Sequence, residues 1–414
     1  MKIYFAPLEG LTDSIYRRLH HKYFPGVDAY FTPFFSPTVH RSLTPREQRE
    51  LPMADTLGFP VVPQLLTKNA EDFLWMTQVC QERGYRQVNL NLGCPSGTVV
   101  SKGKGSGMLG SPDTLDGFLE QIFSQTPLPI SVKTRVGVQS PEEFPRLLEI
   151  FNRYPLAELI VHPRVRKDFY DSPLRMECFR LALEESRCPV CFNGNLCSRE
   201  DIRSAEAQYP SLQAVMLGRG LIADPGMLSP DGTTREALEA FYDELLENYI
   251  ALFGGSRNAM FRLKENWRCL LCRFDGVEKL GKRLRKTTDM EEYKVITHEI
   301  IRNCPMKVRL EPGETSDLAS QDAKESHEAE KYYLTIVLSA KGKPSETITM
   351  SFMATVSEST SSKLVSKTSS TVAAGDGSMI SVSEKVVKTE QLLELYWLEP
   401  GVVVNVANKK GDLT

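Results

Sequence analysis

The sequence contains no apolar run that approaches the roughly 20 residues of a membrane-spanning helix. Residues 1–7 lack the apolar core and cleavage site of a secretory signal peptide. We therefore expect a cytoplasmic protein that contacts no membrane. An excess of one charge is also missing, because 50 lysines and arginines face 53 aspartates and glutamates, for a formal net charge of −3. This balance gives no global sign of nucleic-acid binding, so any basic surface must be local.

Histidine is scarce, with six residues in a chain of 414, and cysteine occurs nine times, an odd number. Such a count indicates reduced thiols rather than a disulfide framework. Two Cys-x-x-Cys pairs occur, Cys188 with Cys191 and Cys269 with Cys272, but no histidine lies at ligand spacing from either. We therefore expect no metal site. A dinucleotide fingerprint after an early strand is missing too, which argues against an open doubly wound sheet.

What the sequence does contain is a series of eight short strand-like runs that alternate with helical segments. The runs are Ile3–Ala6, Asp28–Thr32, Val61–Leu66, Val88–Leu92, Ile130–Arg135, Leu159–His162, Val190–Asn193 and Ala214–Leu217. Helices are expected at 13–22, 69–83, 113–123 and 142–154, the second of them capped by Asn69. This alternation predicts an α/β protein, a (β/α)8 TIM barrel.

Polar residues gather at the carboxyl ends of these predicted strands, where barrels of this kind carry their active sites. They are Gln64, Asn91, Lys133 with Arg135, His162 with Arg164, Asn193, and Gly218 with Arg219. Any one of them has a structural explanation as an ordinary strand-end residue. Together they predict one active site at the barrel mouth.

Cys94 stands just past the strand Val88–Leu92, before a proline that cannot continue the strand ladder. The glycine-rich run Ser101–Gly107 follows it. A buried cysteine that packs as a small hydrophobe is the structural alternative. That alternative is less favoured, because a core cysteine needs no glycine-rich, lysine-bearing cover.

The turns after the last two strands, Phe192–Leu196 and Met216–Gly220, are short and contain glycine. Turns at these places commonly form a phosphate site in barrels, where backbone N–H groups receive the anion. Arg219 adds a charge-assisted contact. A phosphate there, with Gln64, Lys133 and His162 around the mouth, suits a flavin mononucleotide (FMN). In this interpretation Lys133 places a positive charge beside the flavin ring.

The sequence resembles the tRNA-dihydrouridine synthases, which are FMN-dependent (β/α)8 enzymes with a small helical domain after the barrel. The matching motifs run in order through residues 1 to about 305. They are Ala6-Pro-Leu8, Pro63-Gln64, Asn89-Leu-Asn-Leu-Gly-Cys-Pro95, Lys104-Gly-Ser-Gly-Met108, Val132-Lys-Thr-Arg-Val-Gly137, Val161-His-Pro-Arg164, Asn193-Gly-Asn195 and Gly218-Arg-Gly220. Pro163 and Asn195 depart from common family residues, which leaves the target uridine open.

The resemblance implies a reaction and roles for these residues. Hydride passes from FMN to C6 of uracil, and Cys94, the general acid, protonates C5; NADPH or NADH is the reductant. The expected cofactor contacts are Ala6, Pro7, Leu8, Gln64, Lys133, His162, Asn193, Gly194, Asn195, Gly218 and Arg219. Asn91 and Arg135 are expected to hold the uracil, while Lys102 or Lys104 touches the RNA backbone.

The remaining chain divides by composition into three segments after a barrel over 1–230. Residues 231–305 predict a helical tRNA-binding domain that contains a helix at 236–253. Downstream, Lys282, Arg283 and Arg285 belong to a run of basic residues from Arg262 to Lys286, which favours phosphate binding. A solvated helix face is the alternative. Residues 306–330 predict a flexible linker, and 331–414 a β-rich appendage of unknown role. Its strands are expected at 332–338, 348–356, 361–372 and 378–389, with a short helix or a last strand at 391–397.

We expect a monomer whose partner is tRNA. Two other functions stay open at this point. One is an FMN barrel oxidoreductase that acts on a free pyrimidine or an enone, which would need no basic helical module. The other is a catalytically silent RNA-binding barrel.

Overall fold

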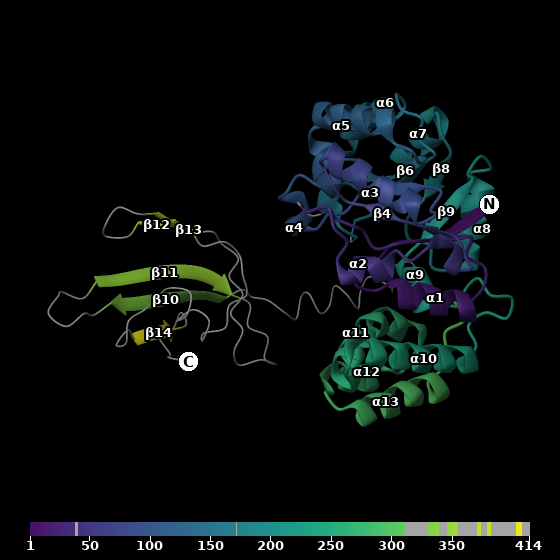
Figure 1. Cartoon of the computed structure of the whole chain (residues 1–414). Helices are drawn as coiled ribbons and strands as arrows, with labels where there is room; N and C mark the ends of the chain where they lie inside the picture. Colours follow the sequence, from purple (N-terminus) through teal and green to yellow (C-terminus); the bar gives the residue numbers. More distant parts are fainter. Residues whose placement is uncertain are drawn as a thin grey trace. The chain divides into compact units, whose positions relative to one another are not determined.

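The computed structural model describes residues 1–37, 40–170 and 172–310, together with five strands further on (Figure 1). Residues 1–319 form one compact unit and residues 320–414 a second. No helix in the described ranges is both long and apolar enough to cross a membrane.

The first unit is built on a parallel sheet of nine strands. In sheet order these are β3 (Val61–Val62), β2 (Ala29–Phe31), β1 (Lys2–Phe5), β9 (Ala214–Leu217), β8 (Val190–Phe192), β7 (Glu158–His162), β6 (Ile130–Arg135), β5 (Val88–Leu92) and β4 (Gln64–Leu65). Each of the eight predicted runs overlaps an observed strand, and the run Val61–Leu66 overlaps two, β3 and β4.

The two strands at the ends of this order are the two halves of one run, separated by Pro63 alone. β3 pairs with β2 and β4 pairs with β5, so the run joins both edges of the sheet. Proline has no N–H to donate and interrupts the ladder, but its carbonyl accepts a hydrogen bond of 2.8 Å from the N–H of Asn89. The sheet is therefore a nearly closed, TIM-like barrel.

Helices cover the outside of the barrel (Figure 1). They are α1 (Ser14–Tyr23), α2 (Pro45–Glu50), α3 (Ala70–Glu82), α4 (Gly97–Val100), α5 (Pro112–Gln125), α6 (Phe144–Phe151), α7 (Met176–Glu185), α8 (Arg199–Gln208) and α9 (Arg219–Ala223). The four predicted helices are confirmed as α1, α3, α5 and α6, with ends shifted by up to three residues. As predicted, Asn69 caps α3, because its side-chain oxygen accepts from the N–H of Asp72.

The barrel interior holds a small apolar cluster that is separate from the main core under the helices. Its members are Tyr4, Ala6, Phe31, Ile160, Cys191, Ala214 and Met216. Beside them, at the amino end of β7, Glu158 accepts a hydrogen bond of 3.2 Å from the hydroxyl of Tyr4 and is 7% exposed. Burial raises the pKa of Glu158 to about 7.

Four further helices follow the barrel within the same unit: α10 (Arg235–Phe253), α11 (Ser256–Leu270), α12 (Glu278–Lys286) and α13 (Met290–Asn303). They lie together at one end of the barrel, next to α1 (Figure 1). Phe241 of α10 packs its ring edge-on against Tyr16 of α1, with centroids 5.3 Å apart. Gly254, with φ +64°, ends α10 in the left-handed conformation. The predicted helix at 236–253 is thus confirmed.

Beyond residue 310 the structure describes β10 (Glu330–Leu338), β11 (Glu346–Ala354), β12 (Thr371–Ala373), β13 (Met379–Ser381) and β14 (Val403–Ala407). β10 pairs antiparallel with β11 and β14, and β12 with β13. The strands predicted at 332–338 and 348–356 overlap β10 and β11. Most of the other two predicted strands, and the helix or strand expected at 391–397, lie outside the described residues.

Candidate active site at the carboxyl ends of the strands

The structure brings the predicted polar residues together where the parallel strands end. The register sets Asn91 of β5 beside Lys133 of β6, and Arg135 of β6 beside His162 of β7. Gln64 of β4 lies next to β5 on the other side. The carboxyl ends of parallel strands lie at the same rim of a barrel, so residues at these ends come together even when they are far apart in the sequence.

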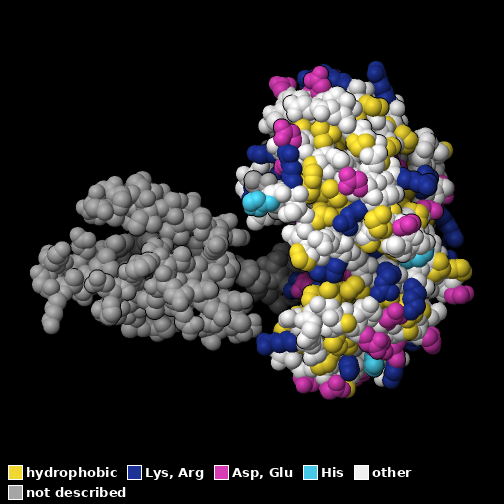
Figure 2. Space-filling model, viewed as in Figure 1, with side chains coloured by type: hydrophobic (Ala, Val, Ile, Leu, Met, Phe, Trp, Pro, Cys, Tyr) yellow, Lys and Arg dark blue, Asp and Glu magenta, His cyan; other side chains and the backbone are white. Residues whose placement is uncertain are grey.

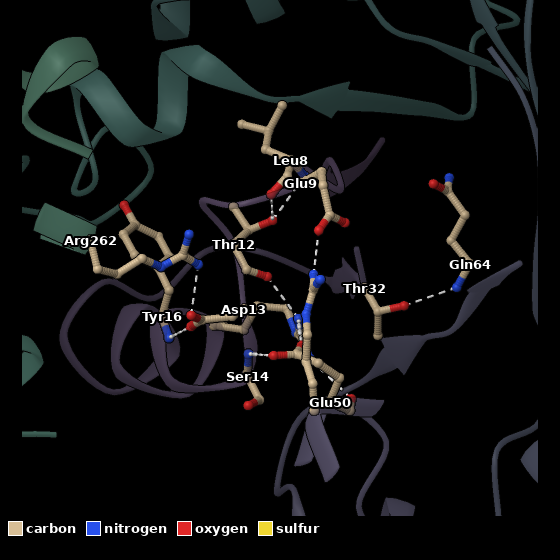
Figure 3. A network of polar contacts seen from close by, with 12 residues as sticks. Leu8, Glu9, Thr12, Asp13, Ser14, Tyr16, Thr32, Glu50, Gln64 and Arg262 are labelled. Carbon is tan, nitrogen blue, oxygen red and sulfur yellow. Dashed lines mark hydrogen bonds and ion pairs between the residues drawn. The ribbon is translucent and has the colours of Figure 1, made fainter. Parts of the chain in front are cut away.

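A chain of side-chain amides fixes the orientation of Gln64. Its Nε2 donates to Oδ1 of Asn89 at 2.8 Å, and its Oε1 accepts from Nδ2 of Asn91 at 2.7 Å. Asn89 in turn donates to the hydroxyl of Ser131 at 2.9 Å. The backbone N–H of Gln64 donates to the hydroxyl of Thr32 at 3.0 Å (Figure 3). Gln64 is thus held rigidly at the mouth rather than left to rotate.

The turn that carries Cys94 is held by Asn91, whose Oδ1 accepts from the N–H groups of Gly93 at 3.1 Å and Cys94 at 3.0 Å. The thiol itself is half-buried. Burial raises the pKa of Cys94, against the opposing influence of Arg135 and Lys133. The thiol therefore stays protonated at neutral pH, as a proton donor must.

The glycine-rich run packs directly behind this cysteine. Ser106 is fully buried and donates to the Cys94 carbonyl twice, from its N–H at 3.1 Å and its hydroxyl at 2.7 Å. Gly105 has φ +58°, and a Cβ there would lie 3.0 Å from the same carbonyl and 2.9 Å from a methyl of Val99. Only glycine fits such a position. The run is therefore a support for Cys94 as well as a carrier of Lys102 and Lys104.

Those two lysines differ in their surroundings. Lys102 is exposed, whereas Lys104 donates to the hydroxyl of Ser36 at 2.9 Å. Burial lowers the pKa of Lys104, with a further contribution from Lys102.

Arg135 is 1% exposed and binds backbone on both sides of the mouth. Its Nε donates to the carbonyl of Gly93 at 3.0 Å, its Nη1 to that of Val165 at 2.9 Å, and its Nη2 to that of Phe169 at 2.8 Å. The guanidinium therefore links the Cys94 turn to the loop after β7. These bonds use three of its five N–H groups, and Arg135 forms a further side-chain hydrogen bond with Tyr170.

Positive charge is concentrated around His162. Burial, together with Arg135, Lys133, Arg164 and Arg219, holds the pKa of His162 well below its usual value. Nη1 of Arg164 lies 3.0 Å from Nε2 of His162, so the neutral ring accepts there and carries its proton on Nδ1. Burial also lowers the pKa of Lys133 to about 8 and that of Arg164 to about 10. Four cationic side chains gathered around one neutral histidine form a site suited to an anion.

Tyr170 belongs to this group and was missed by sequence reasoning. Its ring lies 4.7 Å from the guanidinium of Arg219 and 5.4 Å from that of Arg135, and 5.9 Å from the ring of His162. It is 42% exposed. It lies in an irregular loop after β7, and neither periodicity nor a motif in the sequence marks it.

The turns after β8 and β9 are tightly built, as a phosphate cradle requires. Nδ2 of Asn193 donates to the Met216 carbonyl at 2.7 Å and ties the turn after β8 to strand β9. Asn195 has φ +47°, and its Oδ1 accepts from Arg164 at 3.3 Å. A Cβ on Gly194 would lie 3.0 Å from the side chain of Leu174.

Gly218 lies at the rim between these turns and the first strand. A Cβ on Gly218 would lie 3.5 Å from that of Ala6 and 3.7 Å from a methyl of Leu8, which is ordinary contact. The N–H of Ala6 donates to the Leu217 carbonyl at 2.7 Å. Ala6, Pro7 and Leu8 thus lie beside the turn after β9, where the sequence analysis predicts a phosphate site.

Only some of the basic residues between Arg262 and Lys286 are exposed to solvent. Lys282, Arg283 and Arg285 are exposed on α12, and Arg283 pairs with Glu292 at 3.2 Å. Other members of the run serve the interior: Arg262 pairs with Asp13 at 2.7 Å, Arg273 with Asp224 at 3.6 Å, and Lys264 donates to the Arg285 carbonyl at 3.2 Å. On the face seen in Figure 2 basic and acidic side chains are interspersed, in keeping with the small net charge.

Comparison with known proteins agrees with these features. A family model described as dihydrouridine synthase (Dus) matches residues 4–250. A probable tRNA-dihydrouridine synthase of Staphylococcus aureus (strain MRSA252) is 25% identical over 325 residues, covering 74% of this chain and 95% of that protein. The tRNA-dihydrouridine synthase B of Pasteurella multocida (strain Pm70) is 24% identical over 225 residues, covering 54% and 67%.

Among solved structures, a morphinone reductase mutant in complex with tetrahydroNAD aligns with a TM-score of 0.39 at 11% identity, covering 55% of this chain and 85% of that one. The old yellow enzyme from Trypanosoma cruzi aligns with a TM-score of 0.38 at 9% identity, covering 54% and 86%. The family rests on the match of the family model to residues 4–250. It spans more than half of the 414 residues, and the chain belongs to the dihydrouridine synthase family.

Proposed function

We propose that this chain reduces the C5=C6 bond of a uridine in tRNA, with FMN as cofactor and NADPH or NADH as reductant. One observation carries the proposal: a half-buried, protonated thiol and four cationic side chains share one barrel mouth. The thiol is suited to give a proton, and the cations are suited to bind an anionic cofactor. Membership of the dihydrouridine synthase family supports the reaction.

The residues at the mouth fit FMN. The turns after β8 and β9, with Asn195 and Arg219, would receive the phosphate, since backbone and guanidinium donors converge there. Lys133 would lie against the polar edge of the ring, and the fixed amide of Gln64 would hydrogen-bond that ring. The other proposed contacts are Ala6, Pro7, Leu8, His162, Asn193, Gly194 and Gly218. Bound FMN supplies the hydride that C6 of the uracil receives.

Cys94 supplies the proton in this mechanism. As C6 gains hydride, negative charge develops on C5 and O4, and the thiol of Cys94 gives its proton to C5. A positioned acid of this kind contributes on the order of 10²–10⁴-fold in rate. Asn91 and Ser106 hold the Cys94 peptide from its two ends, N–H and carbonyl, and so keep the thiol in place.

We assign Asn91 and Arg135 to the uracil as well. Both side chains are anchored by other bonds, so the N–H groups that remain on them are presented in fixed directions. Such preorganised donors stabilise charge on the uracil oxygens better than mobile ones. Burial and anchoring thus make these two residues suitable for orienting the base.

The rest of the tRNA needs a docking surface, because the target uridine must leave its stack to enter the barrel. We propose that the exposed residues Lys282, Arg283 and Arg285 bind phosphates, with Lys102 and Lys104 near the mouth. The corresponding division is a barrel over 1–230, a tRNA-binding helical domain over 231–305, a linker over 306–330 and a β-rich domain over 331–414. We propose that the protein acts as a monomer.

The test is to purify the protein and record its flavin absorbance. It is then incubated with NADPH and either bulk unmodified tRNA or free uracil, with 2-cyclohexenone as an enone probe. We expect bound flavin and tRNA-dependent NADPH consumption, with dihydrouridine in the digested tRNA by mass spectrometry. Consumption with uracil or the enone but not with tRNA would show a small-molecule reductase. A colourless protein that binds tRNA would show a silent RNA-binding barrel.

A further inference from the structure

The loop between β1 and α1 begins at the proposed FMN contacts and ends at Asp13. Within it, the N–H of Leu8 donates to the hydroxyl of Thr12 at 2.9 Å, and that hydroxyl donates back to the Leu8 carbonyl at 3.3 Å (Figure 3). The N–H of Thr12 also donates to the Leu8 carbonyl, at 3.0 Å. The backbone of Leu8 is therefore fixed by residues immediately before Asp13.

Asp13 is held by the helices that follow the barrel. Its Oδ2 pairs with Nη2 of Arg262 in α11 at 2.7 Å (Figure 3). The hydroxyl of Tyr249 in α10 donates to the same carboxylate, at 2.9 Å to Oδ1 and 3.0 Å to Oδ2. Oδ1 also accepts from the N–H of Tyr16, so that Asp13 caps α1. One carboxylate thus connects the loop, α1, α10 and α11.

Two further contacts from α11 reach the same loop. Nδ2 of Asn266 donates to the Leu11 carbonyl at 3.4 Å. Gly10 has φ +77°, and a Cβ there would lie 3.5 Å from Nη1 of Arg262, so the guanidinium packs against the loop backbone. The side chains of Arg262 and Asp13 are 17% and 16% exposed, which makes this an ion pair with little solvent screening.

We infer that Arg262 and Tyr249 are positioning residues for the cofactor site: through Asp13 they hold the loop that presents Ala6, Pro7 and Leu8 to FMN. The inference rests on the proposed FMN site and assigns a second role to α10 and α11. The helices proposed to receive tRNA are then also part of the scaffold that binds the cofactor. Neither residue contacts the reacting atoms.

The test compares FMN affinity in apoprotein variants, by titration of FMN fluorescence, with the melting temperature of each apoprotein and the flavin reduction potential as further readouts. Arg262→Met should weaken FMN binding by about ten- to a hundredfold, since small displacements of a site have effects of this size. Arg262→Lys, which keeps the charge, should recover part of the affinity. Tyr249→Phe removes only the hydroxyl and should give a smaller loss.

Arg302→Met is the matched control, because Arg302 of α13 pairs with Glu239 of α10 away from the loop. It should bind FMN as tightly as the parent. Parent-like affinity and potential in Arg262→Met and Tyr249→Phe, even with lowered melting temperatures, would overturn the inference. If Arg262→Met does not fold, Arg262→Lys and Tyr249→Phe decide the matter in the same way. A parent apoprotein that binds no FMN would instead overturn the proposed function.

Discussion

Ser106 donates two hydrogen bonds to the carbonyl of Cys94, at 3.1 Å from its N–H and 2.7 Å from its hydroxyl. The Asn91 side chain accepts from the N–H of the same cysteine. Both polar groups of the Cys94 backbone are therefore used, and the thiol is left as the part of the residue that is available for chemistry.

Cys94→Ala should keep bound FMN and its reduction by NADPH but lose tRNA reduction by on the order of 10²–10⁴-fold, since only proton delivery to C5 is removed. Stopped-flow absorbance separates the two half-reactions. A variant that forms dihydrouridine at the parent rate would contradict the general-acid assignment.

Gly105→Ala should lower tRNA reduction more than FMN binding, because the new methyl would press on the Cys94 carbonyl and on Val99. Gly103→Ala is the control: Gly103 also has positive φ, at +67°, but a Cβ there would lie 3.6 Å from side-chain atoms of Lys68, which is ordinary contact. Both variants place an alanine at positive φ, but only Gly105→Ala should displace Cys94. The comparison therefore separates the effect of backbone strain from the effect of moving the cysteine. Equal losses in the two variants would point to strain alone.

Arg219→Glu should weaken FMN retention by about tenfold or more, because it replaces a charge-assisted contact to the phosphate by repulsion. Flavin content after gel filtration measures this, and circular dichroism checks the fold. Arg219→Lys should retain more flavin than the reversal. A full complement of flavin in Arg219→Glu would contradict the phosphate position.

Reversal of Lys282, Arg283 and Arg285 to glutamate should weaken tRNA binding and leave flavin reduction by NADPH unchanged. Each lost phosphate contact should lower the slope of log affinity against log salt by about one unit. A control with Arg146 and Arg203 reversed, on α6 and α8 of the barrel, should keep the parent slope. An unchanged slope in the triple variant would make the basic helix only a solvated face.

Glu158 should make folding stability depend on pH. Its pKa is about 7 in the folded chain, against an ordinary value of 4.5. The folded state therefore binds more protons between these values, and stability falls as pH rises from 4.5 to about 7. Glu158→Gln, which keeps an acceptor for Tyr4, should be more stable than the parent at pH 8, by on the order of 3 kcal/mol, but not below pH 4.5. Denaturant melts at both pH values measure this, and parallel curves would refute it.

The strands and the polar residues at their carboxyl ends could be predicted from the sequence, because the alternation of strand and helix is visible in short stretches of the chain. In a parallel barrel the carboxyl ends of all strands then lie at one rim. Asn91, Lys133 and His162 follow directly from that rule. Tyr170 does not, because it reaches the mouth through an irregular loop. Nor does the burial of Arg262: a run of basic residues does not show which face of a helix packs against the barrel.

Pro63 has a consequence for how the barrel opens. The strand halves on either side of it have two residues each. β3 pairs with β2, and β4 pairs with β5 and, by a single bridge at Leu65, with Phe35. Such short ladders protect few amide hydrogens from exchange with solvent. Native-state fluctuations should therefore separate adjacent strands first at β3 and β4. Amide hydrogens of β3 and β4 should exchange faster than those of β5 and β6, which share a register of five residue pairs. The part of the sheet that opens most readily would then be the one that contains Gln64.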